Sequence, residues 1–374
     1  MFKKVIILGT IFALFVLLSA SSAQAIVIKD YKWNQVSADG FGDWNNAKVE
    51  KLSVFDKKLY VSTYNDTTGV EIWRTSDGSN WNQVNTDGFG DSNNEYASTA
   101  TVFNNKLYIA TYNSKTGTEL WYTKTGNSWK QKNRDGFSDK DNVSTSVLQP
   151  FKSRLYAFAE RDDNEQTNVF RAKYPKKSTW KSVGEAGLIS GTQGISKPVI
   201  STRLNKEMYV AGENNSFIYK TANGKTWEIV NSEETDDSGW GVTGNTGILS
   251  MVVKNNKLFA GTENPTKGAQ LWVYDNGVWT QKGGAGLGDP ENEAITTLIV
   301  KKGKGGKKYL FASLANDNGL KIFRTRGGSK WFQMNAEDGF GNTNNTYPLD
   351  MYNFAKMLFV TVDDAVWATN FTKN

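Results

Sequence analysis

Tryptophan recurs along this chain at an almost constant interval, and this period constrains the fold more than any other feature. The tryptophans that follow turn-forming residues are 47 to 52 residues apart: Trp33, Trp81, Trp129, Trp180, Trp227, Trp279 and Trp331. A period of about 40–50 residues, made of short strands, is typical of a β-propeller in which each repeat forms one blade.

Each repeat has the pattern of four strands separated by Gly, Asn and Asp turns. The second strand is the clearest, as in residues 59–61 and 107–109, and the fourth strand begins at the recurring tryptophan. The third strand carries an aromatic residue in every repeat: Trp73, Trp121, Phe170, Tyr219, Trp272, Phe323 and Trp367. Aromatic residues at one fixed phase predict packing between neighbouring blades, where each ring buries about 150–250 Å².

The order of strands predicts how the ring closes. Trp33 precedes the first set of three strands, and no tryptophan strand follows the last set. We therefore expect Trp33–Val36 to complete the last blade, which would remove the exposed sheet edges of an open array. The expected architecture is all-β: a single seven-bladed β-propeller of four antiparallel strands per blade, over residues 26–374.

The first 25 residues have the pattern of a signal peptide. Lys3 and Lys4 precede an apolar run, and the stretch ends in Ala23-Gln24-Ala25, a typical cleavage site. The run is shorter than the roughly 20 residues that span a bilayer, although an uncleaved anchor is the alternative. We expect a secreted or periplasmic protein with no transmembrane segment after cleavage.

Composition excludes several kinds of chemistry. The chain contains no cysteine and no histidine, so thiolate or imidazole metal sites, disulfides and Ser-His catalysis are all excluded. The net charge is +6 for the whole chain. No segment mixes basic and aromatic residues in the manner of a nucleic-acid groove, so we expect no nucleic-acid partner. We also expect a monomer.

The turns between third and fourth strands resemble a known motif. Thr75-Ser76-Asp77-Gly78-Ser79-Asn80-Trp81 and Thr221-Ala222-Asn223-Gly224-Lys225-Thr226-Trp227 resemble the Asp-box of sialidase-like propellers, shortened by one residue. In that family the box is a hairpin turn away from the active site, so the resemblance supports the fold. The Asp-Gly and Asn-Gly pairs favour type I′ hairpins, with the Asp side chain capping the local backbone. Sialidases themselves need an arginine triad and usually a Phe/Tyr-Arg-Ile-Pro segment. This chain has no such segment.

The loops that join one blade to the next hold the candidate binding residues. Four of them share the pattern Asp-Gly-Phe-Gly/Ser followed by Asp or Asn residues, at 39–46, 87–94, 135–142 and 338–345. Carboxylate and amide oxygens bind hard cations and sugar hydroxyls. The candidate ligand-binding residues are Asp43, Trp44, Asn45, Asn46, Asp91, Asn93, Asn94, Asp139, Asn142, Asn344 and Asn345. The candidate Ca²⁺ ligands are Asp39, Asp43, Asp87 and Asp91.

Two interpretations of these loops stay open. In the structural one, Gly supplies positive φ, Phe fills the gap between blades, and Asp and Asn satisfy the backbone. In the functional one, the chain is a non-catalytic binding propeller for carbohydrate or another extracellular ligand. The segment Gly42-Asp43-Trp44-Asn45-Asn46 is similar to a Gly-Trp-Asn-Asn loop in propeller lectins that bind N-acetylated sugars, which favours the second. A glycoside hydrolase with paired carboxylates on the same face is the alternative.

The opposite face is expected to be rich in lysine, because the remaining turns carry most of that residue. Its longest turn contains Lys302, Lys304, Lys307 and Lys308. Such a face is either a solvated surface or a docking site for an anionic surface such as phospholipid or cell-wall polymer.

Overall fold

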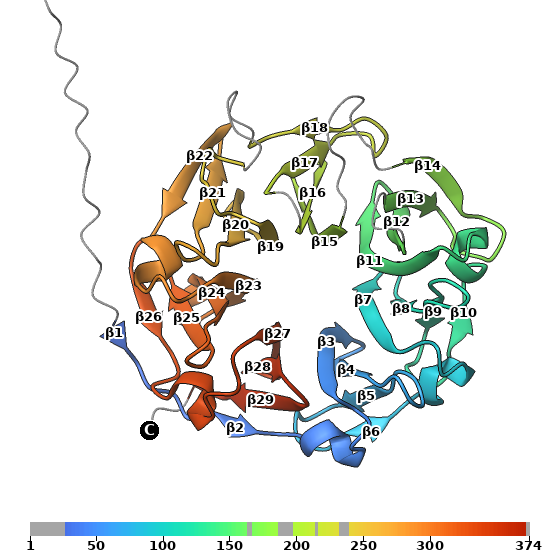
Figure 1. Cartoon of the computed structure of the whole chain (residues 1–374), viewed down its shortest axis with the longest axis horizontal. Helices are drawn as coiled ribbons and strands as arrows, with labels where there is room; N and C mark the ends of the chain where they lie inside the picture. Colours follow the sequence, from blue (N-terminus) through green and yellow to red (C-terminus); the bar gives the residue numbers. More distant parts are fainter. Residues whose placement is uncertain (1–26, 163–166, 186–196, 214–215, 232–238, 372–374) are drawn as a thin grey trace, which may run out of the picture.

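The computed structural model describes residues 27–162, 167–185, 197–213, 216–231 and 239–371, so the expected signal peptide 1–25 lies outside the described residues. The described residues form an all-β propeller of antiparallel sheets arranged around a central axis, with the first strand of each sheet innermost (Figure 1). Within these ranges no helix has the length and apolar character needed to cross a membrane.

Each sheet is an antiparallel meander that runs outward from the axis. Bounds for the first three sheets are β3 (Lys48–Phe55), β4 (Lys58–Tyr64), β5 (Ile72–Thr75) and β6 (Asn82–Gln83); β7 (Tyr96–Val102), β8 (Leu107–Tyr112), β9 (Leu120–Thr123) and β10 (Lys130–Gln131); and β11 (Asn142–Phe151), β12 (Arg154–Arg161), β13 (Thr167–Ala172) and β14 (Lys181–Glu185). The next three are β15 (Lys197–Leu204), β16 (Glu207–Glu213), β17 (Ile218–Thr221) and β18 (Glu228–Ile229); β19 (Gly247–Lys254), β20 (Lys257–Glu263), β21 (Leu271–Asp275) and β22 (Val278–Lys282); and β23 (Ala294–Lys302), β24 (Lys308–Ala315), β25 (Lys321–Thr325) and β26 (Trp331–Gln333).

The last sheet contains strands from both ends of the described chain. Its strands are β27 (Pro348–Phe354), β28 (Met357–Val362), β29 (Ala365–Thr369) and β2 (Asn34–Gln35). β2 pairs antiparallel with β29, opposing Asn34 to Ala368 and Gln35 to Trp367. β1 (Val27–Ile28) lies further back along the ring, parallel to β26 (Figure 1).

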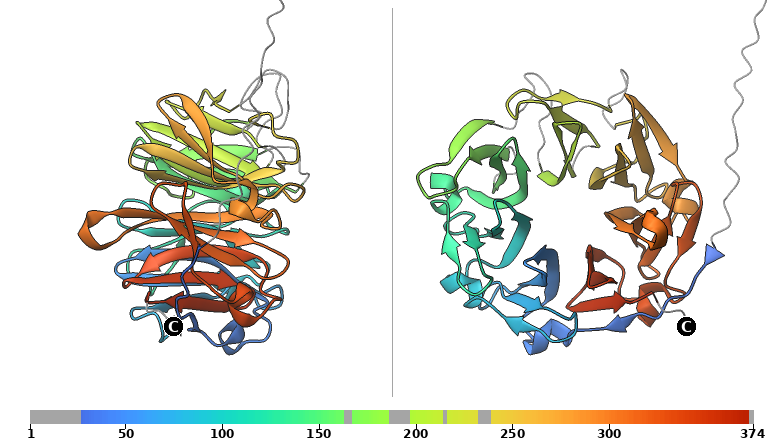
Figure 2. Two further views of the ribbon diagram at one scale, coloured as in Figure 1. Left: turned by 90° about the vertical axis from the view of Figure 1, so that its left-hand side faces the viewer. Right: turned by 180° about the vertical axis from the view of Figure 1, so that it is seen from behind.

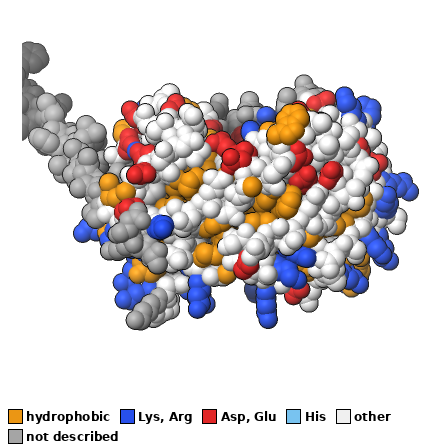
Figure 3. Space-filling model, turned by 90° about the horizontal axis from the view of Figure 1, so that it is seen from below, with side chains coloured by type: hydrophobic (Ala, Val, Ile, Leu, Met, Phe, Trp, Pro, Cys, Tyr) orange, Lys and Arg blue, Asp and Glu red, His pale blue; other side chains and the backbone are white. Residues whose placement is uncertain are grey.

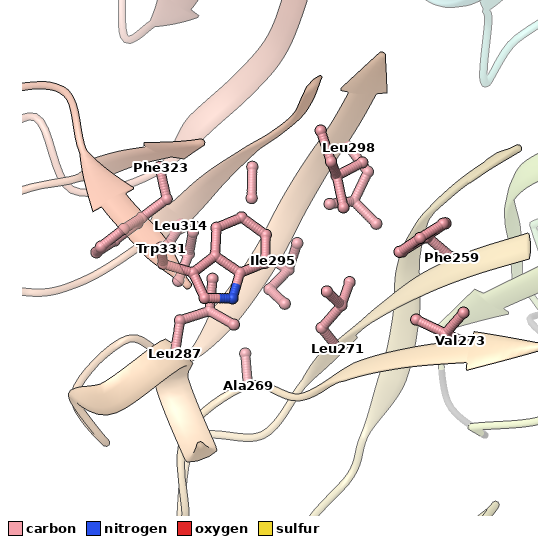
Figure 4. Packing of buried hydrophobic residues seen from close by; sticks show 12 residues of the cluster. Phe259, Ala269, Leu271, Val273, Leu287, Ile295, Leu298, Leu314, Phe323 and Trp331 are labelled. Atoms are coloured by element: carbon pink, nitrogen blue, oxygen red, sulfur yellow. The ribbon is translucent and has the colours of Figure 1, made fainter. Parts of the chain in front are cut away.

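The core lies between neighbouring sheets rather than at the axis. In one cluster, Trp331 and Leu287 pack with Phe259 and Leu298, which come from two adjacent sheets and the loop between them (Figure 4). Comparable clusters of buried side chains fill the other described sheet interfaces. This arrangement explains the fixed phase of the aromatic residues, since each repeat must fill the same wedge.

Six of the hairpins between first and second strands have the type I′ geometry, with positive φ at both central residues, whereas β23 and β24 are joined by a longer turn that contains η5 (Lys304–Gly306). Examples are Asn104-Asn105, where Asn tolerates this conformation, and Lys152-Ser153, where neither residue favours it. The third-to-fourth turns, where the sequence predicted type I′, differ: Gly78 has positive φ but Asp77 does not. That part of the prediction was wrong because the Asp side chain builds the turn. Asp77 Oδ1 accepts bonds from the N–H groups of Ser79 and Asn80, at 2.8 and 2.9 Å.

Every innermost strand contains a β-bulge at the same height. The register shifts between Val49 and Leu52 in β3 and between Ala97 and Thr99 in β7, and the same irregularity recurs in β11, β15, β19, β23 and β27. A bulge turns its extra residue out of the regular alternation. The bulged residues Lys51, Ser98, Ser146, Val199, Leu249, Thr296 and Leu349 line one axial cavity of about 190 Å³.

The two faces of the propeller differ in charge. Figure 2 shows the molecule edge-on, with the hairpin of β23 and β24 extending from one face. In Figure 3, also an edge-on view, acidic side chains gather near one face and many lysine and arginine side chains project from the other. We call the face that carries the blade-joining loops the junction face and the other the hairpin face.

Candidate functional site

The blade-joining loops share one unusual backbone conformation. In η1 (Asp39–Gly42), Gly40 and Phe41 have φ values of 52° and 57°. The same pair of positive values occurs in η2 (Asp87–Gly90), η3 (Asp135–Ser138), η4 (Ala285–Gly288) and η6 (Asp338–Gly341). A bulky side chain at positive φ is strained, so tertiary contacts must hold it there.

Those contacts are made by the aromatic residues of the blade. Phe41 stacks on Trp73 with ring centroids 4.8 Å apart, and its edge meets Trp81 at 5.4 Å. The equivalent groups of three rings are Phe89 with Trp121 and Trp129, Phe137 with Phe170 and Trp180, Trp240 with Trp272 and Trp279, and Phe340 with Trp367 and Trp33. The loop phenylalanines are therefore packing residues, as the structural interpretation predicts.

The candidate aspartates make hydrogen bonds within their own loops. Asp43 Oδ1 accepts bonds from the backbone N–H and the side-chain amide of Asn45, at 2.9 and 3.0 Å. Asp91 does the same with Asn93, and its second oxygen accepts a bond from Asn113 at 3.1 Å. These carboxylates act as local caps on the turn.

The first aspartate of each loop is held by the preceding strand. Asp39 accepts a bond from Gln35 Nε2 at 2.5 Å, and Asp87 accepts one from Gln83 Nε2 at 2.6 Å. Over the ranges that the structure describes, no three Asp, Glu, His or Cys side chains come together in a group that could hold a metal ion. The candidate Ca²⁺ ligands thus lie in separate small networks rather than around one point.

The last asparagine of each loop is buried. Asn46 Nδ2 donates to the Gly40 carbonyl at 2.9 Å and to Glu71 Oε2 at 2.7 Å, while its oxygen accepts a bond from Asn65 Nδ2 at 3.0 Å. Glu71 also accepts the Trp73 indole N–H, and burial raises the pKa of this carboxyl group. Asn94, Asn142 and Asn345 occupy the same place and are buried in the same way. Their amides tie the loop to the blade.

Three candidate residues are exposed to solvent: Asp39, Trp44 and Asn344. Trp44 is 90% exposed, and no ring of the described chain stacks on it; Asn344 is also exposed. Asn45 and Asn93 are partly exposed, and Asp139 pairs with Arg161 at 2.6 Å. Among the candidate loop residues, Trp44 therefore presents an exposed aromatic surface on the junction face.

A second group of side chains lies nearer the axis on the same face, where the innermost strands begin. Tyr96 pairs across the strands with both Tyr64 and Tyr112, and its ring stacks on Tyr112 at 4.9 Å. Burial raises the pKa of Tyr96, and the charges of Glu160 and Glu50 raise it further. These side chains come from three successive sheets, and they face one another only because the sheets form a ring.

The opposite side of this opening adds further acids and a tyrosine. Burial raises the pKa of Tyr347, and the charges of Glu263 and Glu213 raise it further, although the residue is 42% exposed. Burial raises the pKa of Glu160 to about 7; nearby Glu213 raises it and Lys197 lowers it. We call Glu50, Tyr64, Tyr96, Tyr112, Glu160, Lys197, Glu213, Glu263 and Tyr347 the axial mouth.

The axial mouth could not be predicted from the sequence, and the reason is physical. Each of its members resembles an ordinary strand-end residue, and they are spread from Glu50 to Tyr347 without a shared motif. Only their position could have indicated them. They lie where first strands begin and second strands end, which in a propeller is near the axis. The candidate loops were conspicuous because they repeat, and repetition here reflects a structural requirement.

No family model and no curated protein sequence matches this chain. Solved structures do resemble it. YCF48 from Cyanidioschyzon merolae matches with 12% identity and a TM-score of 0.58, over 90% of this chain and 98% of that one. An ancestral GH74 enzyme matches with 14% identity and a TM-score of 0.57, over 90% of this chain and 46% of that one.

A third similar structure is the WD40 β-propeller domain of Doa1, with 11% identity and a TM-score of 0.53, over 92% of this chain and 98% of that one. At these identities the likeness concerns architecture alone. The chain has a β-propeller fold that resembles the YCF48, GH74 and WD40 propellers.

Proposed function

We propose that this β-propeller is an extracytoplasmic binding protein that recognises carbohydrate at the axial mouth of its junction face. One observation carries the proposal: partly exposed tyrosines and carboxylates from several sheets converge at this opening, whereas many polar groups of the junction loops bond within the loop or to the blade. Tyrosine rings offer a flat apolar face with a polar tip, and carboxylates accept hydrogen bonds from hydroxyl groups.

The proposal includes the finer architecture. We infer a seven-bladed ring that Trp33–Val36 completes. Pairing of β2 with β29 supports this, as do the contacts of each innermost strand with the next, including those of β27 with β3. The signal-like segment 1–25 supports a location outside the cytoplasm. A ring of this kind places its loops around one shared opening, where a ligand touches several blades at once.

Glycan binding tests the proposal. The mature protein would be screened on a glycan array, and the affinity for any bound glycan measured by calorimetry. Tyr347→Ala should weaken binding at least tenfold. Tyr352→Ala is the matched control, because Tyr352 is also an exposed tyrosine but lies further along β27, beyond the axial cavity. If no glycan binds, or if both variants bind equally well, carbohydrate recognition at the axial mouth is wrong.

Glycoside hydrolysis is the second candidate, favoured by the Glu160 carboxyl group. A carboxyl group that remains protonated near neutral pH, beside a second carboxylate such as Glu213, is what general acid catalysis requires. Release of new reducing ends from the bound glycan, abolished by Glu160→Gln, would show an enzyme. Binding without release would leave the non-catalytic function.

A further inference from the structure

A hollow on the hairpin face brings together four lysines and three tyrosines from neighbouring sheets. It has a volume of about 400 Å³, and its lining includes Lys106, Lys124, Lys132 and Lys176 together with Tyr122 and Tyr174. Its size falls within the range of small-molecule sites, about 300–1,000 Å³. We call it the lysine–tyrosine groove.

The groove carries uncompensated positive charge. Its lining contains no Asp or Glu residue. None of the four ammonium groups has a carboxylate within ion-pair distance among the described residues. Among the described lysines outside the groove, Lys140, Lys220, Lys257 and Lys321 each lie within ion-pair distance of a carboxylate. Four unpaired cations around one hollow repel each other, and an anion between them would relieve that repulsion.

The Tyr122 ring contacts two of these cations. Lys132 Nζ lies 4.3 Å from the centre of the Tyr122 ring, and Lys106 Nζ lies 5.5 Å from it. Tyr122 in turn stacks at 5.7 Å on Tyr108, which is fully buried. Cation–π contacts of this kind restrict the lysine side chains, so less conformational entropy is lost when they bind an anion.

Tyr174 gives the groove an exposed ring, whose centre lies 5.4 Å from the Lys173 ammonium group. Tyr174 is 63% exposed, and it is followed by the buried Pro175, which limits the backbone at this point. Tyrosine at the rim of a basic hollow offers a surface on which a flat ring can lie, while the ammonium groups reach charges at its edge. A linear polyphosphate has no ring that could lie against this tyrosine.

We propose that the lysine–tyrosine groove binds an acidic polysaccharide, that is, a chain of sugar rings carrying carboxylate or sulfate groups. The sugar ring lies against Tyr174, and the acidic groups pair with Lys106, Lys124, Lys132 and Lys176. This site is on the opposite face from the axial mouth, and it does not depend on what binds there. It also differs from the Lys302–Lys308 turn, which has exposed lysines but lies on another blade.

Binding of polygalacturonate to the full mature chain tests the proposal, with neutral dextran and long-chain polyphosphate as comparison ligands. Lys124→Gln/Lys176→Gln should weaken polygalacturonate binding at least tenfold, and Tyr174→Ala should weaken it several-fold without changing the charge. Lys302→Gln/Lys307→Gln removes the same charge outside the groove and should change the affinity less than twofold. All of these side chains are exposed, so melting temperatures should match the wild type.

Three results would overturn the proposal. The first is no binding of polygalacturonate at 50 mM salt, where exposed charges are less screened than at physiological salt. The second is an equal loss of affinity in the Lys302/Lys307 variant, which would mean general attraction to a basic face. The third is polyphosphate binding at least as tight as polygalacturonate binding and unaffected by Tyr174→Ala, which would identify a phosphate polymer as the ligand.

Discussion

At the scale of single residues, one tight constraint lies where two loops touch through glycine. An ideal Cβ on Gly117 would come within 2.7 Å of the Gly136 Cα atom, whereas one on Gly90 would meet nothing within 4 Å. Both glycines have similar positive φ, 93° and 97°. The pair therefore separates the cost of backbone strain from the cost of a steric clash.

We expect Gly117→Ala to destabilise the protein more than Gly90→Ala. Strain at positive φ should cost about 1–2 kcal/mol in both, and the backbone clash should add about 1–3 kcal/mol in Gly117→Ala alone. Urea unfolding of the two variants measures the difference in the free energy of unfolding. Equal destabilisation would show that the loops move apart without cost.

Glu160 gives a pH dependence with a definite sign. Its folded-state pKa is raised to about 7 from a usual value of 4.5, mainly by burial. The folded protein therefore holds this proton more tightly than the unfolded chain does. The stabilising contribution is fully present below pH 4.5 and is lost as the pH rises through about 7.

We expect the wild type to lose stability relative to Glu160→Gln as the pH is raised from 5 to 7. The difference between their free energies of unfolding should change by no more than about 1.4 kcal/mol per pH unit, the limit for one proton. Chemical unfolding of both proteins at several pH values gives this slope. A constant difference would mean that Glu160 titrates normally.

At the scale of elements, the hairpins between first and second strands need residues that tolerate positive φ, and the sequence does not always supply them. Lys152 and Ser153 adopt φ values of 46° and 60° between β11 and β12. Asn-Gly is the pair that type I′ turns favour. Lys152→Asn/Ser153→Gly should therefore stabilise the protein by about 0.5–1.5 kcal/mol, because it removes strain at two residues.

Thermal and urea unfolding measure this gain. The matched control is Asn105→Gly in the equivalent turn, where φ is already 54° on a tolerant residue. It should stabilise the protein by less. A destabilising effect of the Lys152/Ser153 change would show that these side chains make contacts worth more than the backbone strain.

The strands could be predicted from sequence, but the bulges could not. Short apolar runs such as Leu107–Ile109 depend only on which side chains are buried, so they appear directly in the order of residues. The shift at Ser98 depends on how β7 meets its neighbours around the axis, and no property of Ser98 marks it. The same holds for the axial mouth, whose residues become neighbours through ring geometry.

The candidate loop site was predicted from chemistry that the fold also uses. Asn46 and Asn94 have suitable ligand atoms, but those atoms are bonded to the loop itself. Sequence alone could not separate these uses, because a turn and a ligand require the same oxygen and amide groups. Trp44 was identified by its rarity in the repeat, and the structure leaves it 90% exposed.

At the scale of the whole molecule, the N-terminal segment should control whether the ring holds together. Removing residues 26–37 deletes β1 and β2, leaves the edge of β29 unpaired and removes the Val36 carbonyl that accepts the Trp81 indole N–H. An exposed edge strand also promotes aggregation. We expect this deletion to lower the melting temperature by more than about 10 °C or to make the protein insoluble.

The matched control removes only residues 26–29, which eliminates the short parallel pairing of β1 with β26 and keeps β2. It should lower the melting temperature much less. Thermal unfolding followed by circular dichroism compares the two. A full deletion as stable as the wild type would disprove closure by this segment.

The indole hydrogen bonds of the recurring tryptophans bear on the order in which the chain folds. Trp81, Trp129, Trp180 and Trp279 each donate to a backbone carbonyl 45 to 49 residues earlier, whereas Trp33 donates to Met334, 301 residues later. Contacts with short sequence separation form fast, and distant ones must first bring remote segments together. Blades can therefore assemble one after another as the chain leaves a ribosome or translocon, each fastening to the blade before it. Only the last step must wait for the whole polypeptide, so a nascent chain lacking its C-terminal repeat would hold folded blades and one unsatisfied end.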